Sequence, residues 1–436
     1  MTFTKHLFGI LLATAALLSA APSVKITLDK ADQLYKCGET ATYTIVFTDD
    51  PAEPLAKTAT YKLTNDNVTV FKTGTIDIAQ SPTTTFTETM EKPGFLNLTV
   101  YCSYTDKDGK KQNLKNNICT AGFEPTKIQP AAPKPADFME YWKGELKKAD
   151  KECPIDPQMT KLDKFSNDQH TCYKVSFAAP GGRVYGFLTI PAKAKESKMP
   201  AIVSVPGAGP GMGSPSQDNN FVTLYMNVHP YDPYIEGKTV KESYAELNKP
   251  GIYMFHGGKD REATFFHRAI IGIARAIEWL ANRPEVDAAR IGYYGSSQGG
   301  AFGFIQAGLT GRFAAVVCNV PAMCDHFGVN AGRRAGWPQY RNTFQIKKED
   351  GTTAFDPVTD GWIGYYDAVN FASYIKAPIR VIVGFIDMTC SPSSVYAAFN
   401  GIPSTDKAIV NELDMGHAAR KSYSEAQAWM KGIITK

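Results

Sequence analysis

The chain has 436 residues, of which 43% are hydrophobic and 21% are charged, and its formal net charge is +4. This length favours two domains, and the composition is that of an ordinary soluble globular protein. Without a strong net charge or a long basic run, the sequence gives no support for nucleic acid or an anionic membrane as a partner, and it favours a neutral small molecule or glycan.

The first twenty residues have the pattern of a secretory signal peptide. Lys5 and His6 precede an apolar stretch at residues 7–18, and Ser19-Ala20-Ala21 supplies small residues for cleavage. The apolar stretch is too short to cross a bilayer, and no later segment has membrane length. The sequence therefore predicts export to the periplasm or out of the cell, without a membrane span.

Eight cysteines follow this segment, and an oxidising compartment would permit disulfides between them. Cys37 and Cys102 are one candidate pair, because both are expected to point inward, and Cys153 and Cys172 could close a loop. Two further thiols are expected to be buried and free, namely those of Cys318 and Cys390. No Cys-x-x-Cys spacing occurs, so a zinc or redox motif is not predicted.

Residues 22–127 have the alternating pattern of an all-β domain. Hydrophobic and polar residues alternate from Ala41 to Thr48 and again from Phe95 to Tyr104. Turn signals separate such runs at short intervals, as in a β-sandwich of the immunoglobulin type. No catalytic constellation stands out, so we expect a spacer or interface domain, with a carbohydrate-binding role as the alternative.

A proline-rich linker follows at residues 128–136. Its prolines cannot donate backbone hydrogen bonds inside a sheet, so this segment marks a domain boundary. Beyond it, Asp137 is expected to cap a helix that starts at Phe138. A second domain is therefore predicted at residues 137–436.

The second domain alternates strands and helices after an initial hairpin at residues 173–190. A helix from Thr264 to Leu280 carries an apolar stripe of the kind that packs on a sheet. Further strands are predicted at residues 201–205, 221–228, 291–294, 314–319 and 380–385. This order predicts a mostly parallel sheet with helices on both faces.

A nucleophile-elbow pattern lies in this alternation, at Gly295-Ser296-Ser297-Gln298-Gly299. It follows an apolar strand and precedes a helix of small residues, an order that lifts a serine hydroxyl above the sheet edge. The two glycines permit the close backbone approach that such a turn needs. Ser297 is therefore the candidate nucleophile, and the elbow on a parallel sheet predicts an α/β-hydrolase fold.

Asp387 and His417 are the candidates for the acid and the base that would activate this serine. Asp387 follows the strand at residues 380–385, at the edge where such a sheet presents its chemistry. His417 is the one histidine after this acid, and the fold requires the chain order Ser, Asp, His. His417 would take the serine proton while Asp387 fixes its tautomer. The rival acids are Asp367, Asp406 and Asp414.

Two backbone N–H groups are candidates for the oxyanion hole. One belongs to Gln298, directly after the nucleophile, and the other to Ala208, in a glycine-rich loop after the strand at residues 201–205. That loop lacks the glycine spacing of nucleotide-binding loops. A triad and two donors cover the charge changes of acyl transfer, so we expect neither a metal nor an organic cofactor.

Several of these segments together resemble the acetyl xylan esterase and cephalosporin C deacetylase family, carbohydrate esterase family 7, over about residues 130–436. The resemblance is carried by Pro135-Ala136-Asp137-Phe138 with Tyr141-Trp142, by Phe265-Phe266-His267-Arg268-Ala269, by Gly295 to Gly300, and by Gly384 to Asp387 through Val395 to Asn400. It implies a serine esterase that removes acetyl groups from sugars, with Ser297, Asp387 and His417 as its triad.

Three positions depart from that family's pattern. Its Arg-Gly-Gln motif is replaced by Asn227-Val228-His229-Pro230-Tyr231, so whatever the motif supports is built differently here. The glutamate after the catalytic histidine is Ala418, and the oxyanion tyrosine is Ala208, a change that matters little if only the backbone N–H is used. Family members often form ring-like hexamers, which makes a homo-oligomer an expectation, although the added sandwich domain would alter that assembly.

The predicted function is therefore an exported serine esterase that deacetylates xylo-oligosaccharides or related glycans through an acetyl-enzyme on Ser297. One alternative is a serine peptidase or a broad small-ester carboxylesterase on the same fold, and the absence of a propeller domain argues against the peptidase. Another is a non-catalytic glycan-binding protein, against which the intact triad argues. The glycan, the acetyl position, the acyl-chain preference and the disulfides stay open at this stage.

Overall fold

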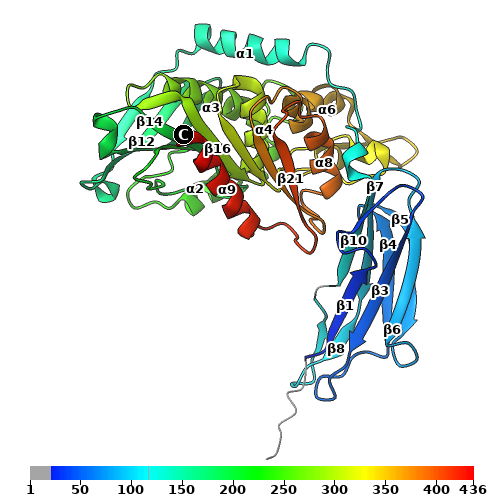
Figure 1. Cartoon of the computed structure of the whole chain (residues 1–436). Coiled ribbons are helices and arrows are strands. Elements are labelled where there is room, and N and C mark those ends of the chain that lie inside the picture. Colours follow the sequence, from blue (N-terminus) through cyan, green and yellow to red (C-terminus); the bar gives the residue numbers. More distant parts are fainter. Residues whose placement is uncertain (1–20, 116) are drawn as a thin grey trace, which may run out of the picture.

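The structure is a computed structural model that describes residues 21–115 and 117–436, so the predicted signal peptide lies outside it. An elongated all-β part, here called the sandwich (residues 23–123), stands beside a larger α/β part (residues 138–434) (Figure 1). The larger part is here called the hydrolase domain, after the fold that its sequence predicts. The strands of the sandwich are β1 (Ser23–Leu28), β2 (Leu34–Tyr35), β3 (Thr40–Thr48), β4 (Thr58–Asn65), β5 (Thr69–Asp77), β6 (Thr83–Thr89), β7 (Gly94–Tyr101), β8 (Ser103–Thr105), β9 (Lys111–Asn113) and β10 (Ile118–Phe123).

The sandwich encloses a hydrophobic core between two sheets, with strand orders β1-β3-β6 and β2-β10-β7-β4-β5. Strand β3 follows the predicted alternation, because Ala41, Tyr43, Ile45 and Phe47 are buried and the residues between them are less so. Strand β7 departs from it, because its residues 94–98 are all buried. One face of this strand packs inside the sandwich and the other faces the hydrolase domain.

The proline-rich segment at residues 128–136 is fastened to the hydrolase domain. The Gln129 carbonyl accepts a hydrogen bond from Arg333 at 2.9 Å, and the Ala131 N–H donates to Asp325 at 2.8 Å. Ile128 is buried in the core of the hydrolase domain. The first part of the connection is therefore fixed to the hydrolase domain and is not a free tether.

Helix α1 (Phe138–Glu152) begins where the sequence predicts, but its cap differs from the expectation. Asp137 occupies the N-cap position without accepting from a helix N–H. Its carboxylate accepts from the hydroxyl of Tyr365 instead. The predicted side-chain cap is wrong because a tertiary partner far along the chain takes the carboxylate.

In the described part of the chain, the central sheet has nine strands in the order β11-β12-β13-β15-β14-β16-β17-β20-β21. The first three pair antiparallel, and the strands from β15 to β21 run parallel to one another. Their bounds are β11 (Gln158–Lys161), β12 (His170–Ala179), β13 (Gly182–Pro191), β14 (Met199–Val205), β15 (Val222–Asn227), β16 (Val286–Ser296), β17 (Ala315–Asn319), β20 (Ile379–Gly384) and β21 (Lys407–Glu412), beside a small pair β18 (Gln345–Lys347) and β19 (Thr353–Phe355).

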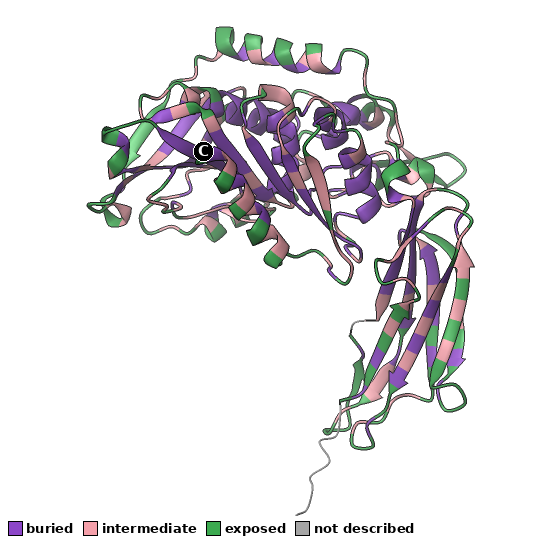
Figure 2. Ribbon diagram, in the orientation of Figure 1, coloured by how far each residue is buried: buried purple, intermediate pink, exposed green. Residues whose placement is uncertain are grey.

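Helices cover both faces of this sheet. They are α2 (Val240–Leu247), α3 (Phe265–Ala281), α4 (Gln298–Thr310), α5 (Tyr340–Thr343), α6 (Pro357–Trp362), α7 (Ala368–Ala372), α8 (Pro392–Asn400) and α9 (Lys421–Ile434). On β17, Val316 and Cys318 join the core that contains α3 and α4, whereas Ala315 and Val317 join the core under α9. The central strands β14, β15, β17 and β20 and most of α4 are almost continuously buried (Figure 2). The predicted mostly parallel sheet with helices on both faces is confirmed.

The strand order of the parallel part of the sheet changes direction at β14. Strand β14 pairs with β15 on one side and with β16 on the other, so the chain crosses over between β15 and β16. Loops diverge at such a switch point, and ligands bind there in open parallel sheets. Val205 lies opposite Gly295 in this pairing. The loop after β14 therefore starts beside the elbow.

All eight cysteines are free in the described residues, so neither the Cys37–Cys102 pair nor the Cys153–Cys172 pair forms. Cys37 lies beside Glu124 instead, and burial together with this carboxylate raises the pKa of its thiol to about 11. The Cys172 sulfur lies 3.4 Å from the Thr189 hydroxyl. The expected burial of Cys318 and Cys390 is confirmed.

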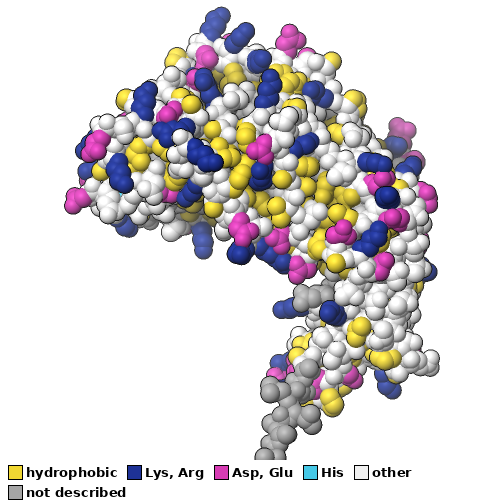
Figure 3. All heavy atoms as spheres, viewed as in Figure 1, with side chains coloured by type: hydrophobic (Ala, Val, Ile, Leu, Met, Phe, Trp, Pro, Cys, Tyr) yellow, Lys and Arg dark blue, Asp and Glu magenta, His cyan; other side chains and the backbone are white. Residues whose placement is uncertain are grey.

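The surface carries basic and acidic side chains side by side on the face drawn in Figure 3, as the small net charge implies. Within residues 21–115 and 117–436, no helix has the length and apolar character needed to cross a membrane.

Candidate active site

Ser297 sits in a strained turn between β16 and α4. Its φ of 57° and ψ of −119° are unusual for a residue with a side chain. Backbone hydrogen bonds hold it there, because its N–H donates to the Asn319 carbonyl at 2.9 Å and its carbonyl accepts from Ala301 at 2.9 Å and Ala322 at 3.0 Å. The serine is therefore presented in a conformation that neighbouring elements impose.

The glycines on either side of the turn are required by close backbone contacts. A Cβ at Gly295 would lie 2.4 Å from the Gly299 carbonyl oxygen, and a Cβ at Gly299 would lie 2.0 Å from the Val205 carbonyl oxygen. The second contact also shows how tightly the end of β14 packs on the elbow. Both glycines have the steric role that the sequence pattern predicts.

Ser297, His417 and Asp387 lie in one chain of hydrogen bonds. His417 Nε2 is 2.9 Å from Ser297 Oγ, and His417 Nδ1 is 2.8 Å from Asp387 Oδ2. Because a carboxylate only accepts, Nδ1 carries the proton, which leaves Nε2 free to accept from the serine hydroxyl. The Asp387 side chain is 0% exposed and that of His417 is 29% exposed. The base can thus exchange protons with solvent while the acid is shielded.

The second oxygen of Asp387 is also held. Oδ1 accepts from the N–H groups of Thr389 at 2.7 Å and Cys390 at 2.9 Å. Such bonds offset part of the cost of burying a carboxylate and fix its orientation. The loop after β20 therefore positions Asp387 through its own backbone.

The rival acids are engaged elsewhere. Burial and the charge of Asp325 raise the pKa of Asp367 to about 7, and its oxygens accept from the N–H groups of Asp325 and His326. Asp406 pairs with Arg380, and Asp414 pairs with Arg420. In the described part of the chain, the carboxylate that meets His417 is that of Asp387.

One candidate oxyanion donor, Gln298, directly follows Ser297, and the other, Ala208, lies in a loop that passes close to the serine. Gln298 is the first residue of α4, and an N–H at this position has no partner within its own helix. The loop that carries Ala208 passes close by, because a Cβ at Gly207 would lie 3.7 Å from the Cβ of Ser297. The positive end of the helix dipole at α4 adds to the stabilisation of negative charge at this point.

The segment that replaces Arg-Gly-Gln holds the Ala208 loop in place. It begins at the last residue of β15, at the carboxyl edge of the sheet, and each contact ends on the loop backbone. The contacts are His229 Nε2 to the Gly209 carbonyl at 2.6 Å, the Tyr231 hydroxyl to the Pro210 carbonyl at 2.6 Å, and the Asn227 amide to the Met212 N–H at 2.9 Å and carbonyl at 3.1 Å. These roles were not predicted, although three polar side chains at the end of a strand, at the same edge of the sheet as the elbow, were a usable signal.

Two further side chains that the sequence analysis did not single out connect parts of the site. The buried Tyr253 hydroxyl donates to Gln298 Oε1 at 2.6 Å, which orients the residue after the nucleophile. The Asn319 amide donates to Ser296 Oγ at 2.8 Å and to the Ala418 carbonyl at 3.0 Å. Asn319 thus joins the elbow to the loop of His417, where the family's glutamate is absent.

Asp387, Cys390 and His417 form the one group of potential metal ligands found among the described residues, with ligand atoms within 4.8 Å of one another. Burial and the charge of Asp387 raise the pKa of the Cys390 thiol well above its usual range. A thiol that stays protonated is a poor metal ligand. The donor set therefore suits proton transfer better than metal binding.

A pH prediction follows from His229, which is 1% exposed. Burial lowers the pKa of its imidazole to about 4, below the value of about 6.5 expected when unfolded. Between about pH 4 and 6.5 the unfolded state therefore binds more protons than the folded state. The stabilisation from neutral His229 is fully present above about pH 6.5 and is lost as the pH falls toward 4, which lowers the free energy of unfolding by up to about 3 kcal/mol.

The measurement is the unfolding temperature from pH 7 to pH 4.5 for the wild type and for His229→Gln, which keeps an N–H donor without titrating. We expect the wild type to lose more stability than the variant over this range. Parallel curves would show that His229 does not contribute to the acid sensitivity.

A family model and a curated relative match most of this chain. The acetyl xylan esterase (AXE1) family model matches residues 124–432, a segment that starts after the last strand of the sandwich. The curated acetyl esterase Axe7A of Xylanibacter ruminicola is 28% identical over 408 residues, which are 92% of this chain and 88% of that protein.

Two solved structures share the fold of the hydrolase domain. An acetyl xylan esterase from Paenibacillus sp. R4 is 21% identical with a TM-score of 0.56, and acetyl xylan esterase 1 from Thermoanaerobacterium sp. JW/SL YS485 is 24% identical with a TM-score of 0.57. Each likeness covers 71% of this chain and 98% of the other. The predicted α/β-hydrolase fold is confirmed. A family match over this length shows that the chain belongs to the acetyl xylan esterase family and is a carboxylic ester hydrolase.

Proposed function

We propose that Ser297, His417 and Asp387 are the catalytic triad of an esterase that removes O-acetyl groups from acetylated xylo-oligosaccharides or related glycans. The observation that carries this proposal is the unbroken hydrogen-bond chain from Ser297 Oγ through His417 to Asp387, with distances of 2.9 and 2.8 Å. Membership of the acetyl xylan esterase family and the likeness to an acetyl esterase support the acetyl group as the one removed.

Acylation would begin with the serine hydroxyl. His417 Nε2 takes its proton while Ser297 Oγ attacks the acetyl carbonyl carbon, and the N–H groups of Gln298 and Ala208 stabilise the oxyanion that forms. Asp387 stabilises the imidazolium through Nδ1. The imidazolium then protonates the sugar oxygen, the carbon–oxygen bond breaks, and the deacetylated glycan leaves an acetyl-enzyme on Ser297.

Deacylation would repeat these steps with water. His417 removes a proton from a water molecule as its oxygen attacks the acetyl carbon, and the same two N–H groups hold the second oxyanion. Collapse of this intermediate returns the proton to Ser297 and releases acetate. The exposure of His417 is consistent with a base that must exchange protons with solvent in every cycle.

The experiment compares acetate release from acetylated xylo-oligosaccharides with butyrate release from the same sugars carrying butyryl esters. We expect kcat/KM for the acetyl substrate to be at least about tenfold higher, because two added methylenes must fit a pocket shaped for acetyl. Similar values for both acyl groups would favour a broad carboxylesterase. Release of an amine from peptides without acetate release would favour a peptidase, and tight sugar binding without turnover would favour a glycan-binding protein.

A further inference from the structure

The sandwich contacts the hydrolase domain next to the loop that carries Asp387, here called the acid loop (residues 385–391). Phe95, on β7 of the sandwich, is 0% exposed and belongs to the core of the hydrolase domain. Its ring lies 5.2 Å from that of Phe385 in an edge-to-face arrangement, and 5.7 Å from that of Tyr396. Phe385 begins the acid loop and Tyr396 lies on α8, which follows it. The sandwich therefore packs against both ends of this loop.

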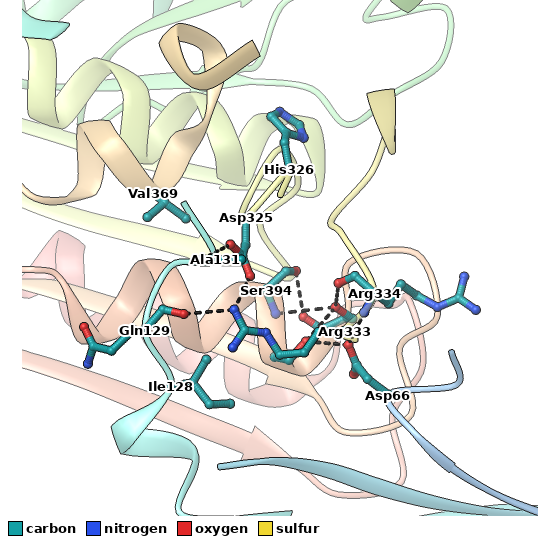
Figure 4. A network of polar contacts seen from close by, with 12 residues as sticks. Asp66, Ile128, Gln129, Ala131, Asp325, His326, Arg333, Arg334, Val369 and Ser394 are labelled. Carbon is teal, nitrogen blue, oxygen red and sulfur yellow. Dashed lines mark hydrogen bonds and ion pairs between the residues drawn. The ribbon is translucent and has the colours of Figure 1, made fainter. Parts of the chain in front are cut away.

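A buried carboxylate makes the polar part of the same junction. Asp66, in the turn between β4 and β5, is 1% exposed and has a φ of 51°. Its Oδ2 accepts from the Arg334 N–H at 2.7 Å and from the Ser393 hydroxyl at 2.5 Å. Its own N–H donates to the Phe95 carbonyl at 2.8 Å, so the polar and aromatic contacts form one unit. Figure 4 shows Asp66 reaching from the sandwich toward the segment of Arg333 and Arg334.

Both partners of Asp66 lead to the acid loop. The Arg334 carbonyl accepts from the Ser391 hydroxyl at 2.7 Å, and three residues later the Trp337 N–H donates to the Thr389 carbonyl at 3.0 Å. Thr389 in turn donates its N–H to Asp387 at 2.7 Å. Ser393 lies in the first turn of α8, directly after the loop. Oδ2 of Asp66 therefore connects the segment from Arg334 to Trp337, which contacts the acid loop, with helix α8, which follows the loop.

We propose that Asp66 is a positioning residue for Asp387, so that the sandwich is a working part of the active site and not a spacer. This inference rests on the proposed function, because it takes Asp387 as the catalytic acid. Without the Asp66 carboxylate, the Arg334 N–H and the Ser393 hydroxyl lose a buried acceptor, and the acid loop gains freedom to shift. Catalytic geometry tolerates little displacement, because a shift of about 1 Å can cost on the order of a hundredfold in rate.

The first test compares three variants of the full chain with the wild type in the hydrolysis of 4-nitrophenyl acetate. We expect Asp66→Ala to lower kcat by about 10- to 100-fold with little change in KM, because the loss concerns the triad and not substrate binding. Asp66→Asn keeps a carbonyl oxygen for both donors and should recover most of the activity. Thr69→Val is the matched control, because the Thr69 hydroxyl donates to the Gly332 carbonyl at 3.3 Å in the same junction, and this partner lies outside the acid loop.

The second test is a double-mutant cycle with Asp387→Ala. If Asp66 acts through Asp387, adding Asp66→Ala to Asp387→Ala should cause no further loss, whereas independent effects would multiply. If Asp66→Ala does not fold, Ser393→Ala replaces it in the cycle, because this change removes one of the two hydrogen-bond donors to Asp66. A merely structural role would lower kcat equally in both backgrounds.

The inference is overturned if Asp66→Ala has the kcat of the wild type, if Thr69→Val falls by as much as Asp66→Ala, or if the cycle shows multiplying losses. These results leave the proposed function intact as long as Asp387→Ala itself is strongly impaired. An Asp387→Ala variant with normal activity would instead overturn the assignment of the acid, and with it the proposed function.

Discussion

Replacing Ser297 with alanine is expected to lower kcat for acetate release by about a thousandfold or more. The hydroxyl supplies the atom that would bond to the acetyl carbon, and the two oxyanion N–H groups alone give only a small residual rate. The strained backbone of the elbow is held by Asn319, Ala301 and Ala322, so the fold should survive the change. The measurement is acetate release under substrate saturation, with the unfolding temperature as a check on folding.

Ser296→Ala is the matched control, one residue away in the same turn. Its hydroxyl accepts from the Asn319 amide at 2.8 Å and makes no contact with His417 among the described residues. We expect it to lose far less activity than Ser297→Ala. If Ser297→Ala kept the wild-type kcat, Ser297 would not be the nucleophile and the acetyl-enzyme mechanism would be wrong.

The second large effect is expected for Asp387→Asn, with a fall in kcat of about 10³- to 10⁴-fold. The asparagine carbonyl can still accept from Thr389 and Cys390 in place of Oδ1. Its NH₂ group then faces His417 Nδ1 and donates to it, which forces the ring proton onto Nε2. A protonated Nε2 cannot take the proton of Ser297. The geometry is thus preserved while the base is held in the wrong tautomer.

Asp414→Asn serves as the control for the loss of a carboxylate near the same edge of the domain, because Asp414 is an exposed partner of Arg420. It should retain nearly full activity. The assignment of Asp387 would not stand if Asp387→Asn stayed within about tenfold of the wild type, since His417 would then be oriented by another group.

The sandwich gains a specific role from this structure. The solved structures align over 71% of this chain, whereas Axe7A aligns over 92% of it. A spacer or interface domain is expected from the sequence, because no catalytic residues stand out in this part of the chain. The contacts of Phe95 and Asp66 agree with an interface, and they place it against the acid loop.

Local patterns were enough to predict the hydrolase fold and the candidate triad. Side-chain periodicity distinguishes strands from helices, and the close backbone contacts of the elbow require glycine at Gly295 and Gly299. The order Ser297, Asp387, His417 follows from the fold once the elbow is found. Export rests on residues 1–20, outside the described part, and stays a prediction.

Other features depend on which segments meet in space. Asp66 and Ser393 form a hydrogen bond although they are 327 positions apart. Asp137 accepts a hydrogen bond from Tyr365, 228 positions away, instead of capping its own helix. His229 reaches Gly209 because β15 lies beside β14, and neither candidate disulfide forms, since Cys37 lies beside Glu124 and Cys172 beside Thr189. Periodicity and turn chemistry are properties of neighbouring residues, so the sequence alone determined the strands and helices around the elbow, the elbow itself and the order of the candidate triad. The partners of a polar side chain depend on strand order and domain docking, so only the tertiary structure decided what holds the site in place.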